Sequence, residues 1–261
     1  MIKFENEEVM GWRHAIRGMR NPMNSWNKSD SKIVNAVLKT RQMAPGVEET
    51  YYAACEPYFS AGKNDFELMM KLRNAGTDHR KFMRMITVYV DITAPLYWWK
   101  EFDTYKVGTV ANSCSTMHKI HEKEFTMEDF SCEKLLYDND DELCPVEAGL
   151  YYKYEPRCVK FFSPVKGLEL IVDLLNANRK AFLETKDKRY WWQMIQLLPT
   201  SYNQTRTVML NYEVLANIYK SRKNHKLDEW REFCKWIESL PYSEIITGEK
   251  EKTEVQEGEN V

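Results

Sequence analysis

Apolar and polar side chains alternate most regularly between residues 84 and 92, in the run RMITVYVDI. The even positions from 86 to 92 are isoleucine or valine, whereas the odd positions from 85 to 91 are Met, Thr, Tyr and Asp. Successive residues of an extended chain point to opposite faces, so this pattern predicts a β-strand with one buried face. A shorter strand is expected at residues 2–4.

Apolar residues at helical spacing predict most of the remaining elements. The first half of the chain should contain a basic amphipathic turn over 12–20, a helix over 32–43 capped by residues 29–31, and a helix over 65–75. Gly76 should end that last helix, because glycine accepts the left-handed conformation. The last third should contain helices over 167–183, 190–198, 207–222 and 227–240.

The strand at 84–92 leads into a short helix and then into a polar loop. Pro95 suits the first turn of that helix, and Thr93 is placed to cap it. The loop over 105–118 is rich in small polar residues, with which a rigid scaffold often builds a ligand site. An irregular stretch over 124–165 follows, with a strand candidate at 151–162.

These elements predict a helix-rich domain that also contains strands. The sequence has neither an internal repeat nor a convincing linker, so one domain is expected over 1–246. Residues 247–261 are polar and charged, and they are expected to form a disordered tail.

The charge balance argues against a dedicated nucleic-acid binder. The 261 residues include 37 Lys and Arg against 39 Asp and Glu, whereas such proteins usually carry a basic excess. A local patch that binds a phosphate is compatible with this balance. The 8 Trp, 15 Tyr and 11 Phe are interpreted mainly as core and interface residues, with stacking on a heteroaromatic ligand as the alternative.

Location and enzyme class are constrained by absent sequence patterns. No run of about 18 apolar residues predicts a membrane helix, and the first residues lack the apolar region of a signal peptide. The six cysteines form no Cys-x-x-Cys pair and are interpreted as reduced thiols, so we expect a cytoplasmic protein. The phosphate-loop, dinucleotide-binding and zincin motifs are missing, which disfavours those enzymes.

Two groups of side chains could carry chemistry, although each has an ordinary structural interpretation. His118 and His121 are spaced to present two imidazoles to a metal, but surface histidines are the more common outcome. Cys114 would need a base, which a histidine at 79, 118 or 121 could supply; a packed thiol is the simpler interpretation. The acidic run at 138–142 lacks EF-hand spacing, so no metal site is predicted.

The polar segment 198–207 precedes the helix expected at 207–222. Thr205 or Thr207 can cap that helix, whose free N–H groups and dipole favour an anion. Arg206 could then hold a phosphate or a carboxylate through its forked donors. An ordinary cap beside a surface arginine is the alternative.

The run YKVGTVANSCSTMH at 105–118 follows the strand and short helix, and Leu198-Pro199 later precedes helices that carry Arg222 and Arg231. This order resembles that of the flavin-dependent thymidylate synthases over about residues 75–240. The resemblance implies an α+β fold of the thymidylate synthase-complementing type, in which a helix-rich domain packs on a small, mostly antiparallel sheet. In that family the corresponding loop has the signature R-H-R-x-x-S-x-N-E-x-S-x-R-Y, which aligns with residues 105–118 without a gap.

Asn112 and Ser115 match the signature, but most of its charged positions are replaced. The replacements are Tyr105, Lys106 and Val107 for the R-H-R triplet, Val110 for the first serine, Ser113 for the glutamate, Met117 and His118 for the last two residues, and Met83-Arg84 for a Glu-His pair before the strand. Because lysine cannot reproduce the bidentate donors of arginine, the family's standard reaction should be impaired, altered or lost.

The resemblance implies FAD as the cofactor, with NADPH and methylenetetrahydrofolate as further ligands, and a uridine or deoxyuridine nucleotide as the substrate. An active enzyme would transfer a methyl group to dUMP. The implied cofactor-binding residues are His79, Arg84, Lys106 and Asn112, and the implied substrate-binding residues are Ser113, Ser115, Arg206, Arg222 and Arg231. No catalytic residue is assigned. The family's assembly implies a homo-oligomer, a tetramer, whose subunits share their sites.

Two functions of other classes are compatible with the same residues. The chain could hold a nucleotide or a flavin without catalysing a reaction, or it could be an interaction protein that reuses the fold and places its aromatic residues at subunit interfaces. Inheritance of the fold favours the flavoenzyme slightly, which is an argument by analogy.

Overall fold

The computed structural model describes residues 2–44, 46–136 and 163–248, and the residue pairs 147–148, 151–152, 155–156 and 160–161. The chain divides into two compact units. Unit 1 comprises Met1–Asn6, Val90–Lys106 and Val110–Val208, and unit 2 comprises Glu7–Tyr89, Val107–Thr109 and Met209–Val261. The acidic run at 138–142 and nearly all of the predicted tail lie outside the described residues.

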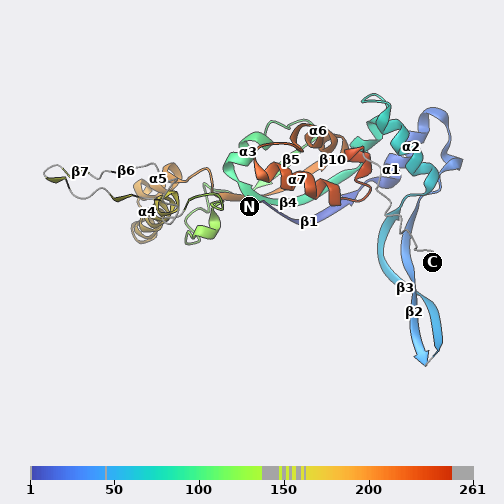
Figure 1. The fold of residues 1–261 in the computed structure, drawn as a ribbon, viewed down its shortest axis with the longest axis horizontal. Helices are drawn as coiled ribbons and strands as arrows, with labels where there is room; N and C mark the ends of the chain where they lie inside the picture. The colour runs from blue at the N-terminus through green and yellow to red at the C-terminus, as the bar shows by residue number, and fades with distance from the viewer. Residues whose placement is uncertain are drawn as a thin grey trace, which may run out of the picture. The chain divides into compact units, whose positions relative to one another are not determined.

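The largest sheet among the described residues has four strands in the order β1-β4-β10-β5 (Figure 1). Its strands are β1 (Lys3–Met10), β4 (Thr87–Pro95), β10 (Asn203–Asn211) and β5 (Val110–Ser113). Alternate residues of β4 from Val88 to Ala94 are buried, which confirms the predicted strand with one apolar face. The strand begins later than predicted, because Arg80–Met85 form a 3-10 helix, η3.

In unit 1, helix α3 (Leu96–Phe102) follows β4 directly, with Pro95 at the predicted position before its first turn. Thr93 does not cap this helix, which corrects the prediction. Its hydroxyl oxygen instead lies 2.7 Å from that of Thr205 on β10. The first two amides of α3 donate to backbone carbonyls of segment 200–202 at 3.0 Å, so main-chain acceptors replace the expected side-chain cap.

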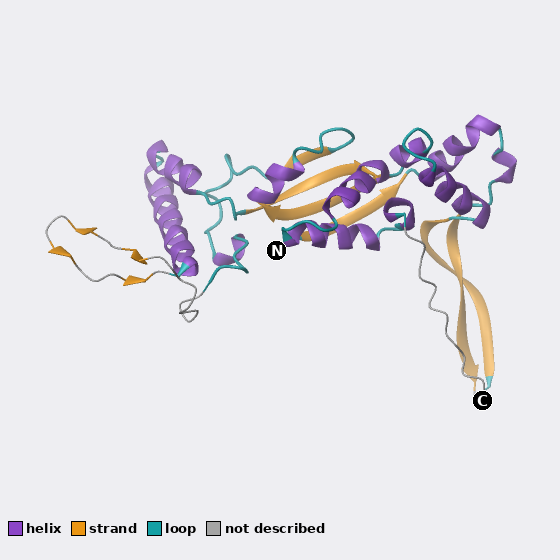
Figure 2. Ribbon diagram, turned by 45° about the horizontal axis from the view of Figure 1, so that its top comes forward, coloured by secondary structure: helices purple, strands orange, loops and turns teal. Residues whose placement is uncertain are grey.

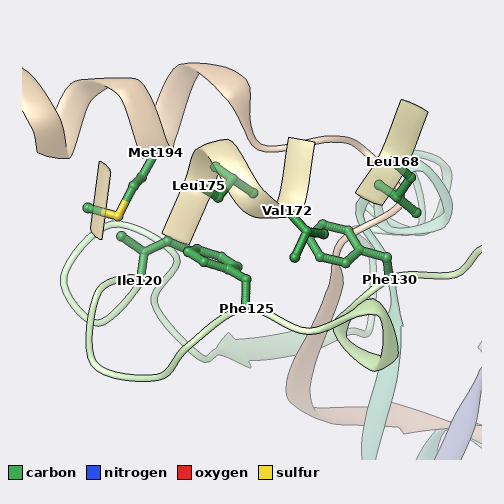
Figure 3. Packing of buried hydrophobic residues seen from close by; sticks show 7 residues of the cluster. All are labelled: Ile120, Phe125, Phe130, Leu168, Val172, Leu175 and Met194. Atoms are coloured by element: carbon green, nitrogen blue, oxygen red, sulfur yellow. The ribbon is translucent and has the colours of Figure 1, made fainter. Parts of the chain in front are cut away.

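Helices α4 (Pro164–Thr185) and α5 (Lys188–Leu197) cover an apolar cluster of unit 1 (Figure 3). Both helices confirm the predictions, and α5 ends just before Leu198-Pro199. A stripe at positions 168, 172 and 175 of α4 faces the cluster, as helical spacing predicts. The cluster consists of Ile120, Phe125, Phe130, Leu168, Val172, Leu175 and Met194. A 3-10 turn, η4 (Met127–Asp129), lies between Phe125 and Phe130 in the chain.

Four two-residue strands fall within the stretch expected to be irregular. They are β6 (Glu147–Ala148), β7 (Tyr151–Tyr152), β8 (Glu155–Pro156) and β9 (Lys160–Phe161), paired as β6 with β9 and β7 with β8. The strand candidate at 151–162 therefore appears as short pieces rather than one strand.

Helix α6 (Tyr212–Arg222) is central to unit 2: most of its own residues are buried, and it contacts η3 and the two helices that follow it in the chain. The other helical elements of unit 2 are α1 (Trp12–Arg20), η1 (Asn21–Met23), η2 (Trp26–Lys28), α2 (Lys63–Asn74), α7 (Asp228–Ser239) and α8 (Glu244–Thr247). The predictions over 12–20, 65–75 and 227–240 are thereby confirmed. Gly76 after α2 has φ 105°, the left-handed conformation expected of it.

The helix predicted over 32–43 is wrong, because these residues form a strand. β2 (Lys32–Ala44) pairs antiparallel with β3 (Val47–Ser60) in a hairpin (Figure 2). Ala44 pairs with Val47, so a two-residue loop joins the strands, and Gly46 in that loop has φ 81°. The Pro-Gly dipeptide at 45–46 is a turn signal, and the β-branched and aromatic residues on both sides favour paired strands over a helix.

The start of the helix predicted over 207–222 is also wrong. Residues 203–211 form β10, and α6 begins only at Tyr212. The side chain of Asn211 caps α6 by accepting a hydrogen bond from the backbone N–H of Val214 at 3.0 Å. Neither Thr205 nor Thr207 therefore lies at a helix terminus, and the predicted anion site there is not formed.

A buried carboxylate organises the segment before β2 in unit 2. Asp65 on α2 has no exposed side-chain surface and pairs with the Nε of Arg20 at 2.6 Å. It also accepts hydrogen bonds from the hydroxyls of Ser29 and Ser31 and from the amides of Asp30 and Ser31. Burial raises the pKa of Asp65, but the hydrogen bonds from Ser31, Ser29 and Arg20 outweigh it and hold the pKa below its usual value.

We predict that Asp65→Asn destabilises the protein by about 3–5 kcal/mol at neutral pH, because it leaves the Arg20 guanidinium buried without its counter-charge. Urea unfolding curves would measure this. Glu67→Gln on the same helix is the control, since Glu67 is exposed and should change stability by less than about 0.5 kcal/mol.

The same pair has a predictable pH dependence. The folded pKa of Asp65 lies below the unfolded value of about 3.9, so its contribution is complete above that value and is lost as the pH falls through the folded pKa. The difference between Asp65→Asn and the original chain should therefore shrink below about pH 4. Equal unfolding midpoints at pH 7 would contradict the role given to this carboxylate.

Candidate functional site

Unit 1 contains a pocket of about 640 Å³ beside strands β4 and β10. Residues 114–116, which directly follow β5, form one wall, and the turn η4 forms another. Its polar lining residues are Lys3, Thr93, Cys114, Ser115, Thr116, Glu128, Asp129, Glu133, Tyr202, Asn203, Gln204 and Thr205. The volume falls within the range of small-molecule sites.

Gln204 fixes the wall of the pocket that belongs to the loop. Its side-chain nitrogen donates to the carbonyl oxygen of Cys114 at 2.8 Å, and its side-chain oxygen accepts from the Nε of Arg206 at 3.0 Å. The backbone amide of Cys114 in turn donates to the carbonyl of Thr205 at 2.9 Å. The side-chain and main-chain bonds therefore hold the loop against β10 independently of any ligand.

Ser115 keeps one hydrogen-bond donor after it has shaped the loop. Its hydroxyl oxygen accepts from the backbone N–H groups of Met117 and His118 at 3.2 and 3.0 Å. Such a local turn uses the acceptor lone pairs of the serine and leaves the hydroxyl hydrogen free to rotate. Ser115 can therefore donate to an acceptor atom in the pocket.

Four further hydroxyl groups line the pocket, those of Thr93, Thr116, Tyr202 and Thr205. Thr93 and Thr205 form a hydroxyl pair that uses one of their two hydrogens, so the pair keeps one donor. Tyr202 is half-buried, and burial, together with the nearby charge of Asp129, raises the pKa of its phenol. The phenol therefore stays protonated at neutral pH and can donate.

The charges of the pocket suit a neutral or weakly polar ligand better than a phosphate. Glu128, Asp129 and Glu133 contribute three carboxylates, whereas Lys3 is the only cation among the described lining residues. Asp129 accepts from the Nζ of Lys123 at 2.8 Å and from the amide of Thr126, so it is already engaged. A flat ring with amide-like donors and acceptors matches hydroxyls and amides of this kind.

Arg206, predicted to bind substrate, is engaged within unit 1. Its Nη1 pairs with Asp103 at 2.7 Å, and its guanidinium lies over the ring of Trp99 with 4.2 Å from the carbon to the ring centroid. It does not line the pocket, although Gln204 links it to the pocket wall. This arrangement corrects the expectation that Arg206 presents free donors beside a helix terminus.

The other predicted site residues are distributed over both units. Ser115 lines the pocket of unit 1. Asn112 and Ser113 lie exposed on β5, Lys106 is exposed, and none of the three lines that pocket. The remaining residues belong to unit 2: His79 and Arg84 are exposed at η3, Arg222 lies over the ring of Trp230, and Arg231 pairs with Asp228.

The alternative chemistry suggested by cysteine and histidine finds little support. Cys114 is an exposed free thiol, and no hydrogen bond among the described residues joins it to His79, His118 or His121. His121 packs edge-on against Phe182 in unit 1. In the described part of the chain, no three His, Cys, Asp or Glu side chains are grouped to hold a metal ion.

The sequence prediction missed the pocket residues at the start of β10. Tyr202 and the first three residues of the strand line the pocket, yet their polar character was interpreted as the approach to a helix. The alternation of buried Gln204, Val208 and Leu210 with more exposed residues was the available signal for a strand.

No protein-family model and no curated protein matches this chain. Solved structures do match. A flavin-dependent thymidylate synthase from Helicobacter pylori, with FAD and dUMP, aligns with 95% of this chain and 98% of its own at 15% identity and a TM-score of 0.58. A second structure of that protein with FAD and dUMP aligns with 94% of this chain and 98% of its own, at 15% identity and a TM-score of 0.56.

A UMP/dUMP methylase from Streptomyces cacaoi, bound to 5-Br dUMP, aligns with 95% of this chain and 94% of its own at 10% identity and a TM-score of 0.52. The chain has the fold of the flavin-dependent thymidylate synthases. The resemblance and the predicted α+β class are thereby confirmed at the level of the fold.

None of the described helices combines the length and apolar character needed to cross a bilayer.

The thiols of this protein should differ sharply in reactivity. Burial, with a contribution from Glu238, raises the pKa of Cys234 to about 11, while Cys114 is exposed in the loop. At pH 8, Cys234 should therefore react with iodoacetamide about a hundredfold more slowly than an ordinary exposed thiol. Site-resolved mass spectrometry would measure both rates, and unfolding in guanidinium should equalise them. Equal rates in the folded protein would contradict the burial of Cys234.

Proposed function

We propose that this protein is a divergent member of the group of proteins that share the flavin-dependent thymidylate synthase fold, and that it binds FAD and a deoxyuridine nucleotide. The observation that carries the proposal is the match over nearly the whole chain to structures solved with FAD and dUMP. A pocket at the end of the loop 105–118 adds a site of suitable size.

The pocket of unit 1 offers groups that complement a uracil or flavin ring. Both rings present an imide N–H between carbonyl oxygens, and the pocket provides hydroxyl donors from Ser115, Tyr202 and the Thr93–Thr205 pair. Asn203 adds an amide whose oxygen accepts from the hydroxyl of Ser131 at 2.9 Å, which leaves its nitrogen able to donate. The fit is to the ring of the ligand, and these side chains would bind and orient it.

The phosphate groups of either ligand find no comparable partners in that pocket, where carboxylates outnumber cations.

A bound flavin would supply the reducing equivalents for methyl transfer. We propose methyl transfer to dUMP as the reaction if the protein is active, with NADPH and methylenetetrahydrofolate as the co-substrates that the resemblance implies. No residue of this chain is assigned a catalytic role.

Binding without catalysis is the second candidate, and the state of the arginines favours it. Arg206 is held by Asp103 and Trp99, and Arg231 is held by Asp228 and two backbone carbonyls. Donors engaged in this way must break existing contacts before they can hold a transition state, which reduces their catalytic value. A homotetramer in the cytoplasm stays a prediction for either candidate.

We predict that the purified protein, incubated with FAD, shows flavin absorbance near about 450 nm after removal of free cofactor, a property of any oxidised flavin. Thermal-shift assays should show stabilisation by FAD and by dUMP through mass action. No retained flavin and no shift with either ligand would refute the proposal. Turnover of dUMP with NADPH and methylenetetrahydrofolate would then separate the enzyme from the binding protein.

Thr205→Val tests the pocket, because it removes a lining hydroxyl at nearly constant volume. Loss of one neutral hydrogen bond should weaken binding of the pocket's ligand about two- to tenfold. Thr207→Val is the matched control: Thr207 lies on the same strand and bonds to Asp91, outside the pocket. Equal affinities of both variants and the original chain would place the ligand elsewhere.

A further inference from the structure

A second pocket, of about 730 Å³, lies wholly within unit 2 between helix α1 and the start of the β2–β3 hairpin. Arg13, His14, Arg17, Arg20 and Lys32 line it, and no carboxylate does so among the described residues. This is the opposite of the charge pattern in unit 1. A concentration of cations without acidic partners favours an anionic ligand.

Among the described residues, Arg20 is the one Lys or Arg of this pocket that has a carboxylate partner. Arg20 is buried and neutralised by Asp65, so it forms part of the floor. Arg13, Arg17 and Lys32 are exposed, and no described carboxylate forms an ion pair with any of them. Within the described part of the chain, the pocket therefore presents three cationic side chains that no carboxylate neutralises.

The spacing of the arginines on α1 is unfavourable unless an anion binds. Arg13 and Arg17 are four residues apart and share one face of the helix, where like charges repel each other. The first turn of α1 contains no acidic residue that could relieve this repulsion. A local conflict of this kind is typical of a binding surface.

The floor and one wall of the pocket are rigid. Asp65 holds Ser29 and Ser31, both lining residues, through their hydroxyls at 2.8 and 2.7 Å. Trp26 forms a wall: its Nε1 donates to Asn21 at 2.8 Å, and the guanidinium of Arg17 lies 5.2 Å from its ring centroid. A ligand would thus meet positioned cations beside an aromatic surface.

We propose that this pocket binds a small molecule carrying a di- or triphosphate, with Arg13, Arg17 and Lys32 as the phosphate ligands. Arginine supplies paired donors that match phosphate oxygens, and lysine adds a point charge. The volume suffices for a whole nucleotide, and Trp26, Ile33 and Phe59 provide apolar surface for a base. The proposal does not rest on the function proposed for unit 1, because the two pockets share no residue.

Isothermal titration of the protein with inorganic pyrophosphate and with ADP tests the proposal. Both ligands should bind, and Arg13→Gln and Arg17→Gln should each weaken binding about tenfold, because each removes a charge-assisted hydrogen bond. These side chains are exposed, so the variants should fold, which circular dichroism would check.

The matched control is the double variant Lys39→Gln/Arg41→Gln, compared with Arg13→Gln/Arg17→Gln. Both pairs lie in unit 2, are exposed and carry the same charge, but Lys39 and Arg41 belong to β2 outside the pocket. The control should bind pyrophosphate like the original chain, which separates a local site from a general charge effect.

Absence of pyrophosphate and ADP binding at millimolar concentration would overturn the proposal. Equal weakening in both double variants would also overturn it. Binding of a single-stranded oligonucleotide without binding of either small molecule would assign the surface to nucleic acid and contradict the ligand class. Failure of dUMP, a monophosphate, to bind in unit 1 would leave the pyrophosphate readout and the effects of Arg13→Gln and Arg17→Gln unchanged, so failure here is distinguishable from failure of the function proposed for unit 1.

Discussion

The candidate site of unit 1 depends on one buried amide, the side chain of Gln204. Its two polar atoms join the loop after β5, through Cys114, to Arg206 on β10. The backbone carbonyl of the same residue accepts from the indole of Trp99 at 2.9 Å, which connects α3. Burial removes an amide from water, and this costs free energy unless hydrogen bonds within the protein replace those to water. Because Gln204 keeps all its partners only in this arrangement, it fixes the loop, the strand and the helix relative to one another.

This arrangement explains how the spacing of the loop signature can persist while its charges are replaced. The contacts that hold the loop are made by main-chain groups, by Ser115 and by Gln204. Met117 and His118, two of the replaced positions, contribute only backbone groups to hydrogen bonds among the described residues: both N–H groups donate to Ser115, and the carbonyl of Met117 accepts from the indole of Trp191 at 3.1 Å. The conformation of the loop therefore does not require arginine or tyrosine there, whereas chemistry at a phosphate does.

The sequence predicts the fold well wherever one periodic pattern dominates. The alternation in β4 and the apolar stripe of α4 each match a single structure, so both elements were found. The prediction over 32–43 failed although its partner strand β3 follows after a two-residue loop, because the apolar residues of this run also fit helical spacing. The prediction over 203–211 failed because the partners of β10, the strands β4 and β5, are distant in sequence. Strand pairing then outweighs local helical spacing, as tertiary context commonly does.

The site was harder to predict because charge pairing depends on neighbours that the sequence does not bring together. Arg206 and Asp103 are far apart in the chain, yet they form a pair at 2.7 Å over the ring of Trp99. Arg13 and Arg17, by contrast, meet no acidic partner among the described residues, although nothing in their local sequence distinguishes them from Arg206. The difference between the two sets of arginines lies in their three-dimensional neighbours, so it is visible in the structure and not in the sequence, and it is the basis of the site proposed on α1.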